Sequence, residues 1–334
     1  FKLKQIFKLR GIYDKIDEPA VAYKGKLMNR VTKHTGSKYP IIQAPMGWIA
    51  RSQLASAVCN AGGLGIIETS SGEVDSCKAE IEKMSELTDQ PFGVNLPLLF
   101  LKDESMVEFC VEHGVKFVTT SAGDPSKYID ILKYAGITVY HAVPSVEGAI
   151  KAANCGVDGL VVEGTEGGGF KSPEEVGLFV LIQAIRKQID LPIIAAGGIA
   201  DGAGMAAAFA VGAEGIQMGT RFVSSKESPV HDNFKKYIFD SPLNGTWILN
   251  KSSKPVIRAL RTDFTKEILD AGEMDMTAMR KIKDLYFEGD MNAAPALSGQ
   301  SVGLIDSIKS AEEIIKDTIK EFNETCSKLS GLKL

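Results

Sequence analysis

The chain has 334 residues, of which 44% are hydrophobic and 24% are charged, values that argue against a disordered or fibrous protein. Its formal net charge of −4 gives no electrostatic reason to expect a nucleic-acid partner, and no run of about 18 apolar residues predicts a membrane span. Five scattered cysteines without a CxxC pair indicate reduced thiols and no metal site, so we expect a cytoplasmic protein.

The first predicted element is an N-terminal extension, residues 1–36. It opens with the basic, amphipathic stretch FKLKQIFKLRGIYDK. An amphipathic helix usually packs its apolar face on its own protein. We favour that interpretation over contact with a membrane surface.

Eight short and almost entirely apolar runs follow. They are PIIQAPM (40–46), GLGIIE (63–68), FGVNLPL (92–98), VKFVTTS (115–121), ITVYHAV (137–143), VDGLVVEG (157–164), LPIIAAGG (191–198) and AEGIQMGTRF (213–222). Runs without polar alternation are typical of strands that are buried on both faces, as in parallel sheets.

Segments with helical spacing separate these runs. Four of them end on a glycine that can adopt the left-handed conformation of a helix end: Gly114, Gly136, Gly156 and Gly212. Strands that alternate with helices predict a (β/α)8 TIM barrel over residues 37–240. Residues 241–334 show helical stretches and no comparable strand pattern, so we expect a helical cap or lid over one end of the barrel.

The loops after the seventh and eighth runs are the usual place for a phosphate site in this fold. The backbone N–H groups of Gly197, Gly198 and Gly219 and the hydroxyl of Thr220 are suitable donors to phosphate oxygens. Tight turns alone also explain these glycines. A dinucleotide-binding fold is disfavoured, because no strand is followed by GxGxxG.

Six ordered motifs carry a resemblance to a known family. They are PIIQAPMGWIARSQLASAVCNAGGLGII, GVNLPL, EGTEGGG, AAGGIADGAGMAAAFAVGAEGIQMGTRF, KESPVHDNFK and SGQSVGLI. Together they resemble the FMN-dependent superfamily of nitronate monooxygenases, also called 2-nitropropane dioxygenases, which includes flavin-type enoyl-ACP reductases and NADH:quinone reductases. The resemblance covers most of residues 37–306.

The resemblance also implies which residues contact FMN. The turn after the first strand lies against the flavin ring, an amide after the third strand bonds the cofactor, and the loop after the sixth strand borders the ring and ribityl chain. The last two barrel loops hold the phosphate, and a C-terminal segment covers the cofactor. By position these residues are Ala44, Pro45, Met46, Gly47, Asn95, Glu163, Gly168, Gly197, Gly198, Gln217, Met218, Gly219, Thr220 and Gln300.

The loop after the sixth run, EGTEGGGFKSPEEV, departs from the family at one position. We interpret glycines 167–169 as making room for a flat ring. A second explanation is that they ease a turn into a helix that is capped at residues 172–175. Many relatives carry a histidine after these glycines, where this chain has Phe170. A phenyl ring moves no protons, so we expect Phe170 to form an apolar wall of the substrate pocket, turned away from solvent. The adjacent Lys171 is expected to be solvated, and the alternative is that it attracts a phosphate or carboxylate.

His141 is the candidate to replace that histidine, because it is the one histidine near the C-terminal end of a predicted strand. Successive strand side chains alternate between faces, so the sequence leaves open whether His141 faces the barrel mouth or a helix. Facing the mouth, it would line the substrate pocket as a catalytic acid or base. Facing a helix, it would be structural.

The function that we favour from the sequence is an FMN-dependent oxidoreductase of nitronate monooxygenase type, which oxidises nitronate-like anions with oxygen. Nitronates are already deprotonated, so such an enzyme needs no histidine base. The alternatives are an NAD(P)H-dependent reductase of enoyl thioesters or quinones and a flavin-binding protein without turnover. In the enzymatic cases the partner is a small-molecule substrate, and the sequence leaves a homo-oligomer open.

Overall fold

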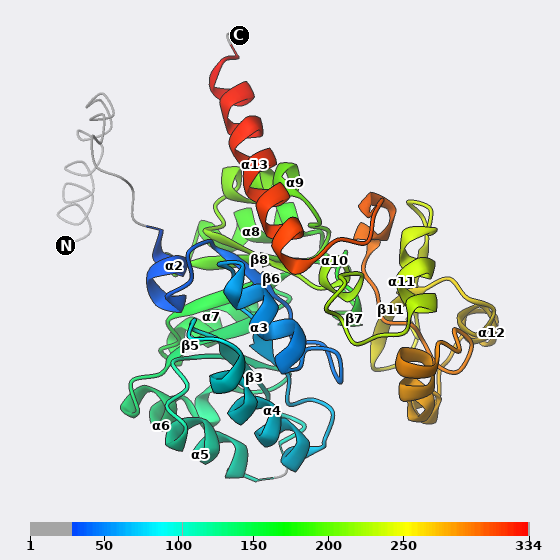
Figure 1. The fold of residues 1–334 in the computed structure, drawn as a ribbon, viewed down its shortest axis with the longest axis horizontal. Helices are drawn as coiled ribbons and strands as arrows, with labels where there is room; N and C mark the ends of the chain where they lie inside the picture. The colour runs from blue at the N-terminus through cyan, green and yellow to red at the C-terminus, as the bar shows by residue number, and fades with distance from the viewer. Residues whose placement is uncertain (1–28, 102, 333–334) are drawn as a thin grey trace, which may run out of the picture.

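The barrel predicted from the sequence is confirmed by a computed structural model, which describes residues 29–101 and 103–332 (Figure 1). Eight parallel strands form one sheet in the order β1-β9-β8-β6-β5-β4-β3-β2. A parallel bridge between Ile42 and Leu64 joins the two ends of this sheet. The predicted amphipathic helix at the start of the chain lies outside the described residues.

The barrel strands all fall within the eight predicted apolar runs. Their bounds are β1 Ile41–Gln43, β2 Ile66–Ile67, β3 Gly93–Pro97, β4 Phe117–Ser121, β5 Thr138–Val143, β6 Gly159–Glu163, β8 Ile193–Ala196 and β9 Gly215–Met218. The last run is cut short because Gly219 takes helical backbone angles and opens the short helix α10, Thr220–Val223.

Helices follow the strands and surround the barrel. They are α3 Ser52–Asn60, α4 Val74–Leu87, α5 Ser105–Glu112, α6 Ile129–Tyr134, α7 Val146–Asn154, α8 Leu178–Arg186 and α9 Gly202–Ala210, and α2 Arg30–Thr35 precedes β1. The four glycines predicted to end helices all have positive φ, from 66° at Gly114 to 111° at Gly212. No helix in the described part of the chain is long and apolar enough to cross a membrane.

Two cores show which way each strand residue points. The barrel interior is filled by side chains that include Ile42, Ile66, Phe117, Tyr140, Val161 and Ile194. A larger core between strands and helices includes Val94, Val118, Val139, Val143, Val162 and Met218. Side chains alternate along a strand, so membership of one core also assigns the neighbouring residues to a face. Each large apolar side chain buried in this way contributes about 1.5–3 kcal/mol.

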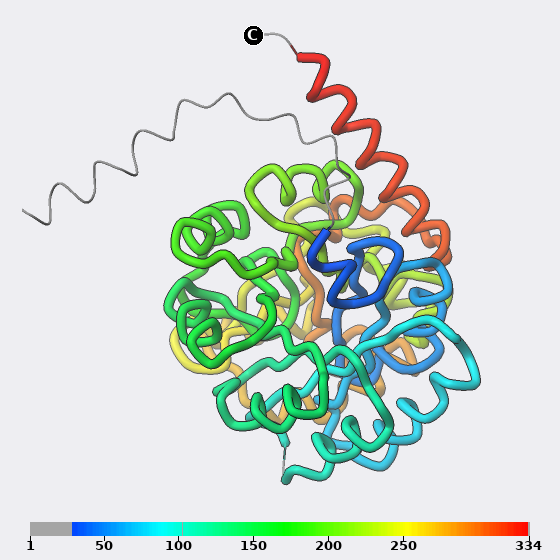
Figure 2. Tube along the Cα trace, turned by 90° about the vertical axis from the view of Figure 1, so that its left-hand side faces the viewer, coloured from blue at the N-terminus to red at the C-terminus, as the bar shows by residue number. Residues whose placement is uncertain are grey.

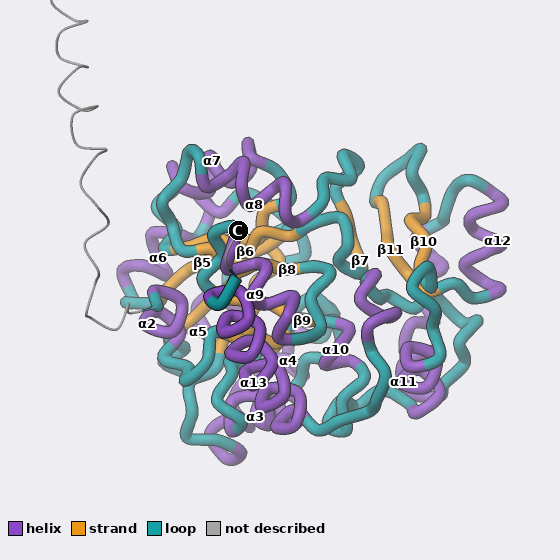
Figure 3. The backbone as a smooth tube through the Cα atoms, turned by 90° about the horizontal axis from the view of Figure 1, so that it is seen from above, coloured by secondary structure: helices purple, strands orange, loops and turns teal. Residues whose placement is uncertain are grey.

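The region after β9 contains two strands that the sequence analysis did not expect. Strands β10 (Thr246–Leu249) and β11 (Val256–Leu260) form an antiparallel sheet with β7 (Gly169–Lys171), beside the barrel strands (Figure 3). The expected helices are also present, as α11 Asp232–Phe239 and α12 Asp263–Ala271 with shorter turns at Met276–Lys281, Asp284–Glu288 and Gln300–Leu304. This region therefore fastens onto the loop after β6.

The C-terminal helix α13, Ala311–Ser330, packs against α9 and α3. A Cβ at Gly202 would collide with the backbone of Phe322, so glycine is needed for this close approach. Helix α13 thus takes the place of the barrel helix that would follow β9, and its end projects beyond the barrel (Figures 1 and 2). The ring of helices is completed by residues after 310, well past the predicted boundary at 240.

Candidate functional site

Free backbone donors lie at the C-terminal ends of β8 and β9. Ala196 pairs with Gln217 in register, so Gly198 and Gly219, each two residues further on, lie at the same level of neighbouring strands. No hydrogen bond within the described chain uses the backbone N–H of either glycine. A Cβ added at Gly219 would lie at least 3.7 Å from the atoms of the turn after β1. The structure thus has room for an anion beside these donors.

Further polar atoms beside these glycines can still form hydrogen bonds with a ligand. The Thr220 hydroxyl accepts a hydrogen bond from the backbone N–H of Gly299 at 2.9 Å and keeps its own proton to donate. The side-chain oxygens Oε1 of Gln217 and Oγ of Ser298 are buried, and neither has a hydrogen-bond partner in the described chain. Buried polar atoms are rarely left unpaired in native proteins. These residues therefore fit a polar, phosphate-bearing cofactor.

The turn after β1, residues 44–48, is fastened by a fully buried carboxylate. Glu68 accepts the backbone N–H of Trp48 at 3.0 Å and further N–H groups at residues 70–71. Arg51 lies 2.8 Å from the same carboxylate. The turns after β1 and β2 are thereby held against each other. The sequence analysis missed Glu68, although the one acidic residue at the end of the run GLGIIE was a usable signal.

Three of the predicted cofactor contacts are placed differently from what the resemblance implies. The Asn95 amide donates to the Thr119 hydroxyl at 3.0 Å inside the barrel. The Met218 side chain packs in the outer core, so only its backbone reaches the mouth. The Gln300 side chain is exposed, and its backbone N–H donates to the loop after β6 at 2.8 Å. Contacts of these residues with a cofactor stay predictions.

Glycines 167–169 each have a separate structural reason within the protein. A Cβ on the first would lie 2.5 Å from Glu163 Oε1 and 2.7 Å from Lys171 Nζ. A Cβ on the second would lie 2.6 Å from the backbone of Ser298. The third has a φ of 76°, which side chains disfavour. In the structure, the close approach made possible by these glycines is therefore to other parts of the chain.

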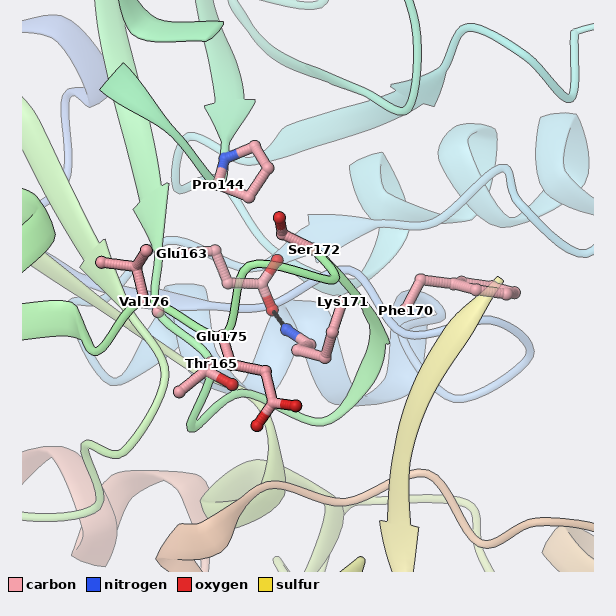
Figure 4. Close-up of a pocket in the computed structure, with 9 residues that line it drawn as sticks. Pro144, Glu163, Thr165, Phe170, Lys171, Ser172, Glu175 and Val176 are labelled. Atoms are coloured by element: carbon pink, nitrogen blue, oxygen red, sulfur yellow. Dashed lines mark hydrogen bonds and ion pairs between the residues drawn. The ribbon is translucent and has the colours of Figure 1, made fainter. Parts of the chain in front are cut away.

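A pocket opens beside this loop (Figure 4). It is lined by Pro144, Glu163, Gly164, Thr165, Phe170, Lys171, Ser172, Glu175 and Val176. The ammonium group of Lys171 is bonded to the Glu163 carboxylate. The Lys171 side chain is 3% exposed and that of Glu163 is 35% exposed. The expectation of a solvated Lys171 was wrong, because the glycine loop folds its ammonium onto the end of β6.

Phe170 lines the same pocket, but its side chain is not turned away from solvent as the sequence analysis expected. Its side chain is 45% exposed, and its ring centre lies 6.4 Å from that of Phe100. Strand pairing with Ile257 of β11 holds the backbone of Phe170 in place. The two rings form an exposed apolar rim, which we call the aromatic rim.

Helix α8 begins later than the predicted capping pattern at 172–175. Its first residue is Leu178, because Glu175 has a φ of 50° and cannot continue a helix. The backbone N–H of Leu178 donates to the Glu166 carboxylate at 3.0 Å. The loop after β6 therefore also supplies the group that stabilises the start of α8.

His141 points away from the barrel mouth. Its neighbour Tyr140 belongs to the interior core, whereas Val139 and Val143, two residues to either side, belong to the outer core. The ring shares a hydrogen bond of 2.8 Å with the Thr120 hydroxyl and is buried. The structure thus contradicts the hypothesis that His141 lines the pocket as a catalytic group, because strand alternation turns it toward the helices.

This placement predicts how stability depends on pH. Burial lowers the pKa of His141 to about 4, below its ordinary value of 6.5. The unfolded state therefore binds more protons between these values, so the stability that His141 contributes is fully present above pH 6.5 and is lost as the pH falls toward 4. We expect His141→Gln to reduce this loss by on the order of 3 kcal/mol in urea denaturation at several pH values. An unchanged pH dependence in the variant contradicts the assignment.

The order of these elements and motifs can be compared with known proteins. The model of the nitronate monooxygenase family matches residues 28–321 of the chain. The chain belongs to this family. The match covers all eight barrel strands and the first half of α13.

Three relatives illustrate the range of proteins that resemble this nitronate monooxygenase family member. FabK from Thermotoga maritima is 40% identical, with a TM-score of 0.87 over 92% of this chain and 99% of its own. A 5-hydroxy-7a-methyl-1-oxo-octahydro-1H-indene-4-carboxyl-CoA dehydrogenase from Rhodococcus jostii is 29% identical over 92% of this chain and 99% of its own. A probable nitronate monooxygenase from Staphylococcus saprophyticus is 30% identical over 90% and 99%. The protein is therefore an oxidoreductase of this family.

Proposed function

We propose that the protein is a flavin-dependent reductase of enoyl thioesters that takes its electrons from NAD(P)H. Two observations support this substrate class, since the superfamily that the motifs resemble includes flavin-type enoyl-ACP reductases and the Rhodococcus jostii protein is named for a CoA thioester. This choice reverses the order favoured by the sequence alone, where nitronate oxidation came first.

The observation that carries the proposal is the composition of the pocket at the barrel mouth. One side presents Phe170, whose ring lies beside that of Phe100 at the edge of the pocket, and this suits an apolar acyl chain. The other presents the ion pair of Lys171 and Glu163. No histidine lines this pocket. A conjugated thioester needs an apolar wall and a proton donor, and both are present.

The cofactor that we propose is FMN, held at the same mouth. The backbone N–H groups of Gly198 and Gly219 and the Thr220 hydroxyl would bind its phosphate. The unpartnered oxygens of Gln217 and Ser298 would accept hydrogen bonds from its polar edge or chain. When bound, FMN supplies transfer of a hydride between NAD(P)H and the substrate, while the protein orients both and excludes water.

Nitronate oxidation is the second candidate, because a specific observation also favours it. The pocket lacks a histidine to abstract a proton, and a nitronate arrives already deprotonated. The Staphylococcus saprophyticus relative carries the corresponding name. The ammonium of Lys171 would then attract the anion rather than donate a proton.

Anaerobic reduction of the purified, flavin-loaded protein tests these candidates. Bleaching of the flavin absorption by NAD(P)H, followed by reoxidation with an enoyl thioester, supports the reductase. Bleaching by a nitronate and not by NAD(P)H supports the oxygenase and contradicts our first proposal. Absence of bleaching by either compound indicates a flavin-binding protein without turnover.

The aromatic rim gives a prediction about chain-length preference. We expect Phe170→Ala to lower kcat/KM for long-chain substrates by about 10- to 100-fold, because it removes an apolar contact worth roughly 1–3 kcal/mol. Substrates with the shortest chains should lose much less. Steady-state kinetics over a series of chain lengths measures the difference. Equal losses at every length, or no loss, contradict an acyl-binding role for Phe170.

A further inference from the structure

We propose that Lys171, held by Glu163, donates the proton that completes reduction of the substrate in the pocket at the barrel mouth. This inference rests on the proposed function. Both residues lie next to glycines 167–169, and the ammonium of Lys171 reaches back to the last residue of β6 (Figure 4).

The position of Glu163 places the ion pair at the mouth. Val161 belongs to the interior core, so Glu163, two residues later on the same strand, has the inward orientation at the C-terminal end of β6. Lys171 is almost fully buried, whereas one third of Glu163 is exposed. The ammonium is therefore shielded from bulk solvent, while both residues line the pocket.

Local backbone structure holds the ion pair of Lys171 and Glu163 in position. Gly167 lies against both charged groups and leaves them the space that any Cβ would fill. Pairing of Lys171 with Val256 of β11 fixes the backbone of the lysine. A buried lysine left without its partner is costly, so the carboxylate and the sheet together hold the side chain in place.

The other charged groups around the pocket already have partners or point elsewhere. Glu175 pairs with Lys251 at 2.8 Å on the exposed side. Glu166 caps the start of α8, and Arg258 of β11 donates to the backbone oxygen of Thr165 at 2.9 Å. Among the described residues that line the pocket, Lys171 is the one with a cationic side chain.

The step balances in atoms and electrons. A hydride that originates from NAD(P)H adds to the β carbon of the enoyl thioester, and the carbon–carbon π bond breaks. An N–H bond of the Lys171 ammonium breaks as a C–H bond forms at the α carbon. The neutral amine then regains a proton from water, for which the exposed side of Glu163 provides the contact with solvent.

Two substitutions at Lys171 test the proposal. Lys171→Met removes the charge and the proton. Lys171→Arg keeps a charge that can pair with Glu163, but a guanidinium does not release its proton near neutral pH. We expect both variants to lose about 100- to 10,000-fold in kcat, the usual range for a lost general acid. In stopped flow, flavin reduction by NAD(P)H should stay near the wild-type rate, and only reoxidation by the thioester should slow.

Lys251→Met is the matched control, because Lys251 pairs with an acidic residue of the same pocket from its exposed side. We expect wild-type kinetics from it. If Lys171→Arg turns over like the wild type while Lys171→Met does not, Lys171 acts only through its charge and the proposal is overturned. Reoxidation at the wild-type rate in Lys171→Met overturns it as well.

Glu163→Gln gives a readout that a merely structural role would not move. Removing the carboxylate disfavours the buried ammonium, so the high-pH limb of the kcat profile should move to lower pH. An unmoved limb contradicts the proposal. If the wild-type protein reduces no enoyl thioester, the proposed function itself fails. Normal wild-type turnover with unimpaired Lys171 variants refutes the proton donor alone.

Discussion

We expect replacement of Gly219 by valine to abolish binding of the proposed flavin and to leave the barrel folded. The backbone φ of Gly219 is −99°, which any residue adopts, and a Cβ there would meet the chain itself only at 3.7 Å or more. The side chain would instead occupy the space beside the free N–H groups, where we place the phosphate. We expect flavin content after purification to fall from stoichiometric to a few per cent, measured by absorption near 450 nm, with activity lost in proportion.

Gly331→Val is the control for this prediction, because Gly331 also has a negative φ and ordinary contact distances, at the far end of α13. Its flavin content should equal that of the wild type. Thermal unfolding of both apoproteins checks that the fold is retained. Full flavin occupancy in Gly219→Val would refute the placement of the phosphate.

The second large effect is expected at Gly168. Alanine there would place its Cβ 2.6 Å from the backbone of Ser298, so the segment that carries Gly299 and Gln300 must move. Backbone atoms cannot move aside to relieve a collision as easily as the end of a flexible side chain can. We expect the free energy of unfolding to drop by about 3 kcal/mol or more, at the upper end of overpacking effects. Chemical denaturation measures this loss.

Gly169→Ala separates steric collision from backbone strain. Gly169 has a φ of 76°, but a Cβ there would meet nothing closer than 3.9 Å. Its cost should be about 1–2 kcal/mol, from the left-handed conformation alone. A Gly168→Ala protein as stable as Gly169→Ala contradicts the assignment of different reasons to the glycines of this loop.

Elements governed by local pattern were predictable from the sequence. The eight barrel strands can be recognised in the sequence as apolar runs, because both faces of a parallel barrel strand are buried. The helix-ending glycines were predictable because the left-handed conformation is a property of single residues. The free donors at Gly198 and Gly219 also follow from position, since loops after the last two strands meet at one barrel end.

Pairings between distant segments were not predictable in this way. Strand β11, which also pairs with β10, is joined to the loop after β6 by its pairing with β7, and α13 belongs to the barrel because Gly202 of α9 admits its backbone. No local pattern in residues 241–334 contains either partner. The sequence therefore predicted separate helices where the fold forms a sheet and a barrel helix.

The same distinction between local pattern and distant pairing applies to the candidate site. By itself the sequence determined the barrel pattern and the resemblance to this family, with an apolar residue, Phe170, at the position where that resemblance implies a histidine. Only the tertiary structure decided that His141 faces outward and that Lys171 folds onto Glu163. The face to which a strand side chain points can be assigned only when its interior neighbours are known. An ion pair forms only when the turn between its two residues brings them together. Both depend on packing among segments that the sequence presents apart, so they emerge only when the chain is folded.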